Sequence, residues 1–510
     1  MADYDNEQIK DVEVGIIGGG SMGGGMTLLF SSPASSNSVV GFFDYDKEQA
    51  EALLKRARDE DDVPAEHVHG FSSAEKLLKA FKPNEPRIIV FSLPHGKPVD
   101  DVLSDLLPKM DKGDIIIDCG NEWYEDTNRR LGEAAEKGIH YIGCGVSGGY
   151  QAARRGPSMS AGGDKEAYDK VEHLLAKWAA KDKDGKPCVA YLGPGGSGNY
   201  VKMIHNGIEH AQLSILCEIW SLLRHQAGLS NDEIADIFES WNAEGRLSDN
   251  YLIEIGYKSL RFKKGDGIFN KKGVVEDIAD KVVQDVDNTE GTGTWSVAEM
   301  ATRHFAAPAM AASHCLRVIS ARRGERDRVL ENLKVPQPKT DQPFVKDVPA
   351  FVEDCRKATY AGILGAFVQG LGIITKASDE EKWGVSLETC LAIWRAGCIV
   401  RSGGIADLLQ PLLAKDPQCK NTLFIPEIAH ELSGTYDGLK NVCRVALETD
   451  AVAPALAVTL DWLKQCGGKE LPTNFQEMQM DYFGHHQYDL KSENAPDPVK
   501  GPHHTEFAPA

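Results

Sequence analysis

The segment VEVGIIGGGSMGGG, residues 12–25, places glycines at a fixed spacing directly after an apolar run of strand type. Gly18 permits a tight turn, Gly20 lets a pyrophosphate approach the backbone, and Gly23 lets a following helix pack closely on the strand. The N-terminus of that helix offers unpaired N–H groups and a positive dipole end to phosphates. A second apolar run ends at Asp44, 21 residues beyond Gly23, which is the spacing of a dinucleotide-binding domain. The loop residues expected at the dinucleotide are Gly18, Gly20, Ser21, Met22 and Gly23.

Asp44 also bears on which nicotinamide dinucleotide is bound. A carboxylate at this point accepts hydrogen bonds from the adenosine ribose hydroxyls but repels a 2′-phosphate, and the following residues, FFDYDKEQ, include no arginine. The pattern favours NAD over NADP, with Asp44 and Tyr45 at the ribose. The alternative is that Lys47 turns inward and binds a 2′-phosphate.

Apolar runs of strand type alternate with helical stretches from residue 12 to about residue 196. The runs are VEVGIIGGG, SVVGFFDYD, PRIIVFSLP, DIIIDCGN, IHYIGCGVSGG and PCVAYLGPGG. Such alternation predicts βαβ units on a parallel sheet. The strand signal nearly vanishes after residue 198, where long segments with a period of 3.6 residues follow. We therefore expect an α/β Rossmann-type domain in residues 1–197, a large all-α domain in residues 198–468, and a C-terminal tail in residues 469–510.

Two polar, turn-rich segments, residues 263–273 and 336–343, interrupt the helical part. The last thirty residues, from Asp481, lack helical periodicity and end in a stretch rich in proline and histidine. Such a segment is disordered on its own unless another surface orders it.

Charge and cysteine usage exclude several classes of protein. The net charge of −20 argues against nucleic acid or an anionic membrane as the main partner. The sequence has no run of about 18 apolar residues, so no transmembrane helix is expected. The N-terminal residues lack the pattern of a signal peptide. The eleven cysteines include no CxxC pair, which fits a reducing compartment better than a disulfide framework or a zinc site. We expect a cytoplasmic protein without a metal centre.

The stretch NYVKMIHNGIEH, residues 199–210, carries four polar side chains with helical spacing. Lys202, His205, Asn206 and Glu209 stand at i, i+3, i+4 and i+7 and would share one helix face beside an apolar stripe. A lysine whose pKa is lowered by burial can accept a hydroxyl proton as hydride leaves for a nicotinamide, and a second titratable group can deliver a proton elsewhere. His205 and Asn206 would hold substrate oxygens. The alternative is an ion pair between Lys202 and Glu209 on a solvent-exposed face.

Several further motifs, together with this helix, resemble those of 6-phosphogluconate dehydrogenases, the decarboxylating enzymes of the pentose phosphate pathway. In order, they are CGNEWYEDTNRR, GCGVSGGYQAARRGPSMSAGG, VKMIHNGIEH, WNAEGRLSDNYLIEI, EGTGTW, WRAGCIVRS and NFQEMQMDYFGHHQY. The resemblance runs nearly from end to end of the chain. It implies a metal-free oxidative decarboxylation of 6-phosphogluconate to ribulose 5-phosphate and CO₂, with which the absence of a clustered set of metal ligands in the sequence agrees.

The resemblance also implies roles for individual residues. Lys202 would be the general base for oxidation at C3 and would then protonate the oxyanion, and Glu209 would protonate C1 of the enediol. The residues implied to hold the sugar acid are Asn121, Ser147, Gly148, Gly149, His205, Asn206, His210, Thr292 and Arg317, with Asn121 also at the cofactor. A homodimer is implied in which the tail of one subunit reaches the other's active site and contributes His486. The alternative for His486 is an exposed tail histidine.

The sequence departs from the family pattern at the ends of both ligands. An Asn-Arg-Thr turn that grips the 2′-phosphate of NADP is replaced by Asp44-Tyr45-Asp46, which again favours NAD. Around the substrate, Glu290 replaces a phosphate-binding lysine, Met480 replaces a tail arginine, and His210 replaces a tyrosine. The loop at residues 147–154 has also lost an acidic residue near the sugar.

These changes make the phosphate of the substrate an open question. Each charge-assisted hydrogen bond contributes about 1.5–3 kcal/mol, so two lost donors weaken phosphate binding by about two to four orders of magnitude unless other groups compensate. Thr292, Arg317 and His486 are retained, and the leading interpretation keeps 6-phosphogluconate because the fold and Arg317 are kept. The main alternative is the same chemistry on another C6 aldonate, either unphosphorylated or sulfonated. A non-catalytic dinucleotide-binding protein is a remote alternative, disfavoured by the intact Lys202, Asn206 and Glu209.

Overall fold

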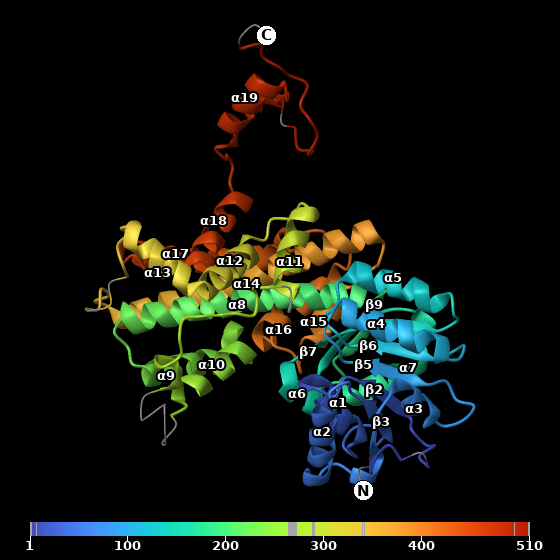
Figure 1. The fold of residues 1–510 in the computed structure, drawn as a ribbon. Helices are drawn as coiled ribbons and strands as arrows, with labels where there is room; N and C mark the ends of the chain where they lie inside the picture. Colours follow the sequence, from blue (N-terminus) through green and yellow to red (C-terminus); the bar gives the residue numbers. More distant parts are fainter. Residues whose placement is uncertain are drawn as a thin grey trace. The chain divides into compact units, whose positions relative to one another are not determined.

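The computed structural model describes residues 3–6, 8–263, 273–287, 291–338, 340, 342–493 and 495–507. Its contacts divide the chain into two compact units, residues 1–459 and 460–510, each described here by itself (Figure 1). The first unit contains a large sheet with its covering helices, followed by a long helical part. The expected fold class, an α/β Rossmann-type domain followed by a large all-α domain, is confirmed.

The sheet has nine strands in the order β1-β4-β3-β2-β5-β6-β7-β8-β9. Their bounds are β1 (Asp3–Tyr4), β2 (Val14–Ile17), β3 (Val40–Phe43), β4 (Val68–Phe71), β5 (Ile88–Phe91), β6 (Ile115–Asp118), β7 (His140–Ser147), β8 (Ser158–Gly163) and β9 (Val189–Gly193). Six of these strands match the predicted runs, whereas β1, β4 and β8 were not predicted.

The expectation of a wholly parallel sheet is wrong at one pair, because β7 and β8 are antiparallel. Only residues 148–157 lie between these two strands, and they form the short helix α6 (Gly149–Arg155) with its flanking turns. A parallel return needs a crossover of about a dozen residues or more, so this connection is too short for one.

Helices cover both faces of the sheet, which explains why the strands are apolar throughout rather than alternating. Successive strand residues point to opposite faces, so Ile16 packs in one core and Ile17 in the other. The first core is closed by α1 (Ser21–Ser31), α2 (Lys47–Asp59) and α7 (Lys165–Trp178). The second core is closed by α3 (Ala74–Lys79), α4 (Lys97–Leu106) and α5 (Tyr124–Ala135).

No strand follows β9 among the described residues of the chain, and the helical part begins with α8 (Ser197–His225). The helices after α8 are α9 (Asn231–Ala243), α10 (Tyr251–Arg261), α11 (Thr292–Thr302), α12 (Pro308–Ala321), α13 (Arg323–Asn332), α14 (Val348–Glu381), α15 (Leu387–Ile393), α16 (Gly403–Lys415), α17 (Pro426–Glu448) and α18 (Pro454–Cys466). The long helices α8 and α14 lie side by side, and α17 packs on α14 (Figure 1).

By length and composition alone, α14 could cross a membrane, but 94% of its most apolar window is buried inside the protein. A Cβ atom placed on Gly362 would lie 2.8 Å from Ile215, and one on Gly370 would lie 2.6 Å from Ile208. The backbones of α14 and α8 therefore approach closely through these glycines. We interpret α14 as the central core helix of this part of the fold.

The second unit holds α19 (Thr473–Gly484) and the final segment of the chain. Asp481 is buried, and its carboxylate accepts hydrogen bonds from the backbone N–H groups of Gln487 and Thr505, each at 2.9 Å. The segment after α19 lacks helical periodicity, as expected, but it folds back on this carboxylate. Tyr488 and His503 pair across the fold.

Glu218 is a buried carboxyl group on α8 that caps the start of α18. It accepts hydrogen bonds from the N–H groups of Ala455 and Leu456 at 2.8 and 2.9 Å. Burial raises the pKa of Glu218 to about 7, and the two backbone donors oppose that rise only in part. A carboxyl group with a higher pKa in the folded chain favours folding while it is protonated, so this stability is lost as the pH rises from about 4.5 to about 7.

As the pH rises from about 4.5 to about 7, we expect ionisation of Glu218 to reduce the free energy of unfolding by about 3 kcal/mol. The variant Glu218→Gln should lack this reduction. Urea unfolding of both proteins at pH 5 and pH 8 measures the effect as a difference between them. The variant should gain stability relative to the parent as the pH rises, whereas Glu136→Gln, at an exposed position after α5, should not. A difference between parent and Glu218→Gln that is the same at both pH values would contradict the prediction.

Candidate active site

The first turns of α8 lie directly on strand β7 of the sheet. A Cβ atom placed on Gly145 would lie 2.2 Å from the Cβ of Lys202, and one on Gly143 would lie 2.2 Å from Oδ1 of Asn199. Only glycine at these two strand positions leaves room for the helix. Lys202 is thereby fixed against the sheet and is 7% exposed.

The polar side chains expected on one face of α8 form a hydrogen-bonded row. Oδ1 of Asn206 accepts from Nζ of Lys202 at 2.8 Å and lies 3.0 Å from Nδ1 of His205. Nδ2 of Asn206 donates to Oγ1 of Thr292, the first residue of α11, at 3.0 Å. Because Lys202 and His205 are buried, an exposed ion pair on a solvated face does not describe this row.

His205 is fully buried, and its protonation follows from its neighbours. Burial and the positive charge of Lys202 lower the pKa of His205 well below its usual value, so the imidazole is neutral. Since Oδ1 of Asn206 is an acceptor, we assign the proton to Nδ1 and the lone pair to Nε2. Nε2 is buried without a hydrogen-bond partner among the described residues. A substrate hydroxyl can satisfy it. Glu209 follows one turn further on, with Oε2 3.9 Å from Nδ1 of His205.

The glycine-rich loop has the geometry that its sequence predicts. Gly18 has φ +99°, and a Cβ atom there would lie 2.2 Å from the carbonyl oxygen of Ser92. A Cβ atom on Gly23 would lie 1.8 Å from the carbonyl oxygen of Gly18, whereas Gly20 has nothing within 4 Å. Gly20 therefore presents open backbone at the start of α1, beside Ser21 and Met22. This is the surface that a pyrophosphate needs.

Asp44 closes the loop at the end of β3. Its Oδ2 accepts from the N–H of Gly19 at 2.5 Å, and its Oδ1 accepts from the N–H of Asp46 at 2.7 Å. Each carboxylate oxygen keeps a further lone pair for a ribose hydroxyl. Asp46 in turn caps α2 through the N–H groups of Glu48 and Gln49.

A cavity of about 560 Å³ opens beside this loop. Asp44, Tyr45 and Asp101 lie in its wall, and the residues lining it include no basic side chain. Lys47, the alternative ligand of a 2′-phosphate, pairs instead with Glu51 at 3.5 Å on the exposed side of α2. Asp101 pairs with Lys97 at 2.6 Å, whereas the carboxylate of Asp44 accepts from backbone N–H groups.

The remaining sugar-acid positions lie at loops after strands. Asn121 follows β6, and Ser147, Gly148 and Gly149 form the turn between β7 and α6. Gly148 has φ +101°, and a Cβ atom placed on it would lie 2.3 Å from the carbonyl oxygen of Gly397.

The far end of the row shows a residue that sequence reasoning missed. Oδ2 of Asp285 lies 2.5 Å from Nε of Arg317, so the guanidinium expected at the substrate phosphate already faces a carboxylate. Asp285 also lies beside Gly293, against which His210 packs. Nothing in the local sequence pattern marks Asp285, because its partners come from α8 and α12.

The prediction of a chain without a metal centre stays a prediction, although the structure brings the side chains of His210, Asp285 and His314 together. The three residues come from separate segments, two of them helical, so no sequence spacing reveals them. Glu290 lies outside the described residues. His486 and Met480 belong to the second unit and line a cavity within it.

The fold and this site define a nicotinamide-dependent oxidoreductase with a Rossmann domain followed by a helical domain. Two family models match the chain: the NAD binding domain of 6-phosphogluconate dehydrogenase over residues 13–193, and the 6-phosphogluconate dehydrogenase C-terminal domain over residues 198–507. The chain belongs to the 6-phosphogluconate dehydrogenase family and is a decarboxylating dehydrogenase of that family.

Relatives of known name span the whole chain. The decarboxylating 6-phosphogluconate dehydrogenase of Emericella nidulans is 46% identical over 501 residues, which cover 96% of this chain and all of the relative. An Arabidopsis thaliana enzyme of the same name, number 2, is 33% identical over 98% of both chains. Among solved structures, Plasmodium falciparum 6-phosphogluconate dehydrogenase is 32% identical, with a TM-score of 0.85 over 98% of this chain and all of that one. That protein was solved with NADP⁺ and with 6-phosphogluconate.

Proposed function

We propose that this protein converts 6-phosphogluconate to ribulose 5-phosphate and CO₂, with NAD as the preferred oxidant. The observation that carries the proposal is the buried row in which Lys202 and His205 share the Oδ1 atom of Asn206. The row is fixed against the sheet that carries the dinucleotide loop. Lys202, as a base, and Nε2 of His205, as a hydrogen-bond acceptor for a hydroxyl group, are thus buried beside the cofactor domain.

Each residue of the row has a step in this reaction. Lys202 removes the proton of the C3 hydroxyl as hydride leaves C3, and the bound nicotinamide supplies the hydride acceptor. The resulting β-keto acid loses CO₂, and Lys202 returns the proton to the oxygen that becomes the enediol hydroxyl. Glu209 then protonates C1 of the enediol to give the ketopentose. The Nε2 atom of His205 and the side chain of Asn206 hold the substrate hydroxyls.

The preference for NAD rests on the cavity beside the glycine-rich loop. The carboxylates of Asp44 and Asp101 line it, and a 2′-phosphate there meets like charge with no basic side chain from the cavity wall. The Plasmodium relative binds NADP⁺, so a preference for NAD would distinguish this chain from it.

One observation favours a second substrate class, a C6 aldonate with an uncharged or sulfonated end. Arg317 is the retained guanidinium at the phosphate end, and Asp285 neutralises it at 2.5 Å. A phosphate dianion must compete with this carboxylate for Arg317, whereas a neutral hydroxyl need not.

A side-by-side assay tests both proposals. Reduction of NAD and of NADP is followed together with CO₂ release on 6-phosphogluconate, gluconate and 6-sulfogluconate, with Lys202→Ala as the blank. We expect the highest kcat/KM for NAD with 6-phosphogluconate. A higher value on gluconate or 6-sulfogluconate would establish the second substrate class, and turnover confined to NADP would contradict the preference for NAD.

We also propose a cytoplasmic homodimer in which the C-terminal tail of one subunit supplies His486 to the active site of the other. His486 is exposed in the structure, and the resemblance of the tail motif to that of the family supports this proposal. None of the eleven cysteines forms a disulfide bond, which supports a reducing compartment. We propose a small-molecule sugar acid as the ligand, without nucleic acid or membrane as a partner.

A further inference from the structure

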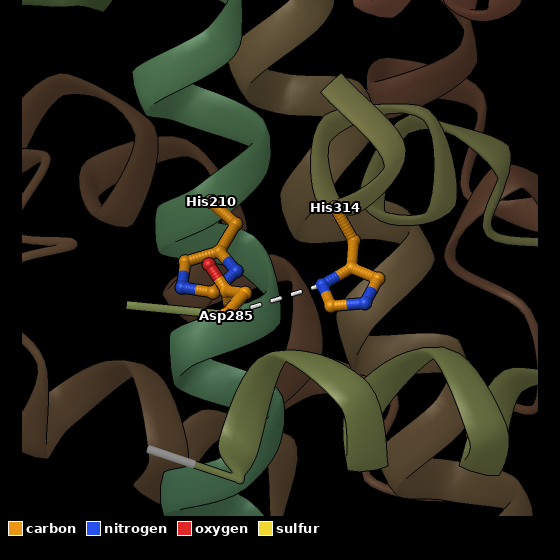
Figure 2. Close-up of side chains that lie close together, drawn as sticks. All are labelled: His210, Asp285 and His314. Atoms are coloured by element: carbon orange, nitrogen blue, oxygen red, sulfur yellow. Dashed lines mark ion pairs between the residues drawn. The ribbon is translucent and has the colours of Figure 1, made fainter. Parts of the chain in front are cut away.

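Three side chains with metal-binding atoms meet at the end of the polar row. His210 comes from α8, Asp285 from the segment at residues 273–287, and His314 from α12 (Figure 2). One ligand atom from each lies within 4.8 Å of the other two. His210 is 8% exposed, and the side chains of Asp285 and His314 are 3% and 16% exposed.

The two oxygens of Asp285 have different surroundings. Oδ2 lies against Arg317, whereas Oδ1 lies 3.8 Å from Nδ1 of His314. A Cβ atom placed on Gly293 would lie 2.7 Å from Oδ1 of Asp285 and 3.1 Å from Nδ1 of His210, so these two atoms face the same point. Arg317 therefore orients the carboxylate and leaves Oδ1 directed at the two imidazoles.

The spacing of these atoms is too wide for hydrogen bonds between them. At 3.8 Å, Asp285 and His314 do not share one, and Nδ1 of His314 is buried without a hydrogen-bond partner among the described residues. Two ligands of one tetrahedral ion, with bonds of about 2.0–2.2 Å, stand about 3.4 Å apart. The distance of 3.8 Å between Oδ1 of Asp285 and Nδ1 of His314 is close to that separation.

The chemical types of the three ligands also indicate which ion they would bind. Two imidazoles and one carboxylate select an ion of intermediate softness rather than magnesium or calcium.

We propose that His210, Asp285 and His314 bind one divalent transition-metal ion of the zinc class, with a fourth position open. A divalent cation beside Asp285 and Arg317 leaves a local excess of positive charge, which attracts an oxyanion. Gly293, at the wall of the cluster, directly follows Thr292 of the polar row. The ion would thus supply positive charge beside the polar row, on the side of Thr292 and His210.

The test uses the full chain, stripped of metal and titrated with Co²⁺ alone, with binding read from the visible ligand-field absorption. His314→Ala and His210→Ala should each weaken the tightest Co²⁺ binding event at least about 100-fold. The double variant should lose this same event and leave any weaker binding events unchanged. Asp285→Asn keeps the shape of the side chain and should weaken the same event. Zn²⁺ should displace the Co²⁺.

Two controls separate this site from other histidines. His225→Ala, at the end of α8, and His504→Ala, beside Asp481 in the second unit, should leave the tightest event unchanged. Circular dichroism shows whether each variant is folded. If a histidine variant is unfolded, the Co²⁺ affinity of Asp285→Asn tests the proposed site instead. Equal affinity and equal spectra in the parent and Asp285→Asn or His314→Ala would overturn the proposal. No substrate is present, so failure of the proposed reaction would leave this result standing.

Discussion

Replacement of Lys202 by alanine is expected to lower kcat for dinucleotide reduction by a factor of about 10³ or more, with NAD binding unchanged. The neutral amine of Lys202 is the base that the proposal assigns to the C3 hydroxyl, whereas Nε2 of His205 is assigned to holding a hydroxyl and Glu209 lies a turn further on. General-base catalysis contributes about 10²–10⁴-fold. Stopped-flow or steady-state reduction of NAD, with release of CO₂, measures the loss.

Two further variants separate chemistry from packing. Lys202→Met keeps an aliphatic stem against Gly145 and removes only the ammonium, so it should lose as much activity as Lys202→Ala while unfolding at the same temperature as the parent. Lys165→Ala, at an exposed position at the start of α7, should retain full activity. A kcat for Lys202→Met above about a tenth of the parent value would exclude Lys202 as the base.

Replacement of Asp44 by asparagine is expected to lower the ratio of kcat/KM for NAD over NADP by about 60-fold to 10⁵-fold. The carboxylate supplies a charge-assisted hydrogen bond to the ribose worth about 1.5–3 kcal/mol and repels a 2′-phosphate by about 1–4 kcal/mol near a protein surface. Asp44 also accepts from the N–H groups of Gly19 and Asp46, so the variant will disturb the loop. Damage to the loop weakens both cofactors alike, and the ratio isolates the discrimination.

Asp46 provides a matched control two residues away. Asp46→Ser removes an exposed carboxylate close to Asp44 but keeps a residue type that caps α2. It should leave the ratio within about threefold of the parent, because the repulsion falls with distance and is screened by salt. If Asp46→Ser changes the ratio as much as Asp44→Asn does, the discrimination comes from net charge and not from contact with the ribose.

The sequence was most informative where structure is local. The spacing of Lys202, His205 and Asn206 is a property of the helix itself, and the structure places the three side chains in one hydrogen-bonded row. The dinucleotide loop could also be predicted from the sequence, because its glycines act within one strand–turn–helix unit. In both cases the residues that interact lie within about two helical turns or one loop.

What the sequence did not reveal depends on contacts between distant segments. Strand β8 has the composition SMSAGG, which has low strand propensity and is held by pairing with β7 and β9. Asp285 and His314 carry no periodic signal toward His210, because three separate segments supply the cluster. Gly143 and Gly145 read as ordinary strand residues until the helix that lies on them is known.

The contact of α8 on β7 has a consequence for exchanging parts between enzymes. The junction between β9 and α8 is a tempting crossover point for grafting a different dinucleotide-binding module onto this helical domain. A donor sheet with alanine or larger at the positions of Gly143 and Gly145 would lift α8 and displace Lys202, because an added Cβ overlaps the helix at 2.2 Å. A working chimera must therefore inherit the seventh strand together with the helical domain, so the functional boundary lies inside the sheet and not at its end.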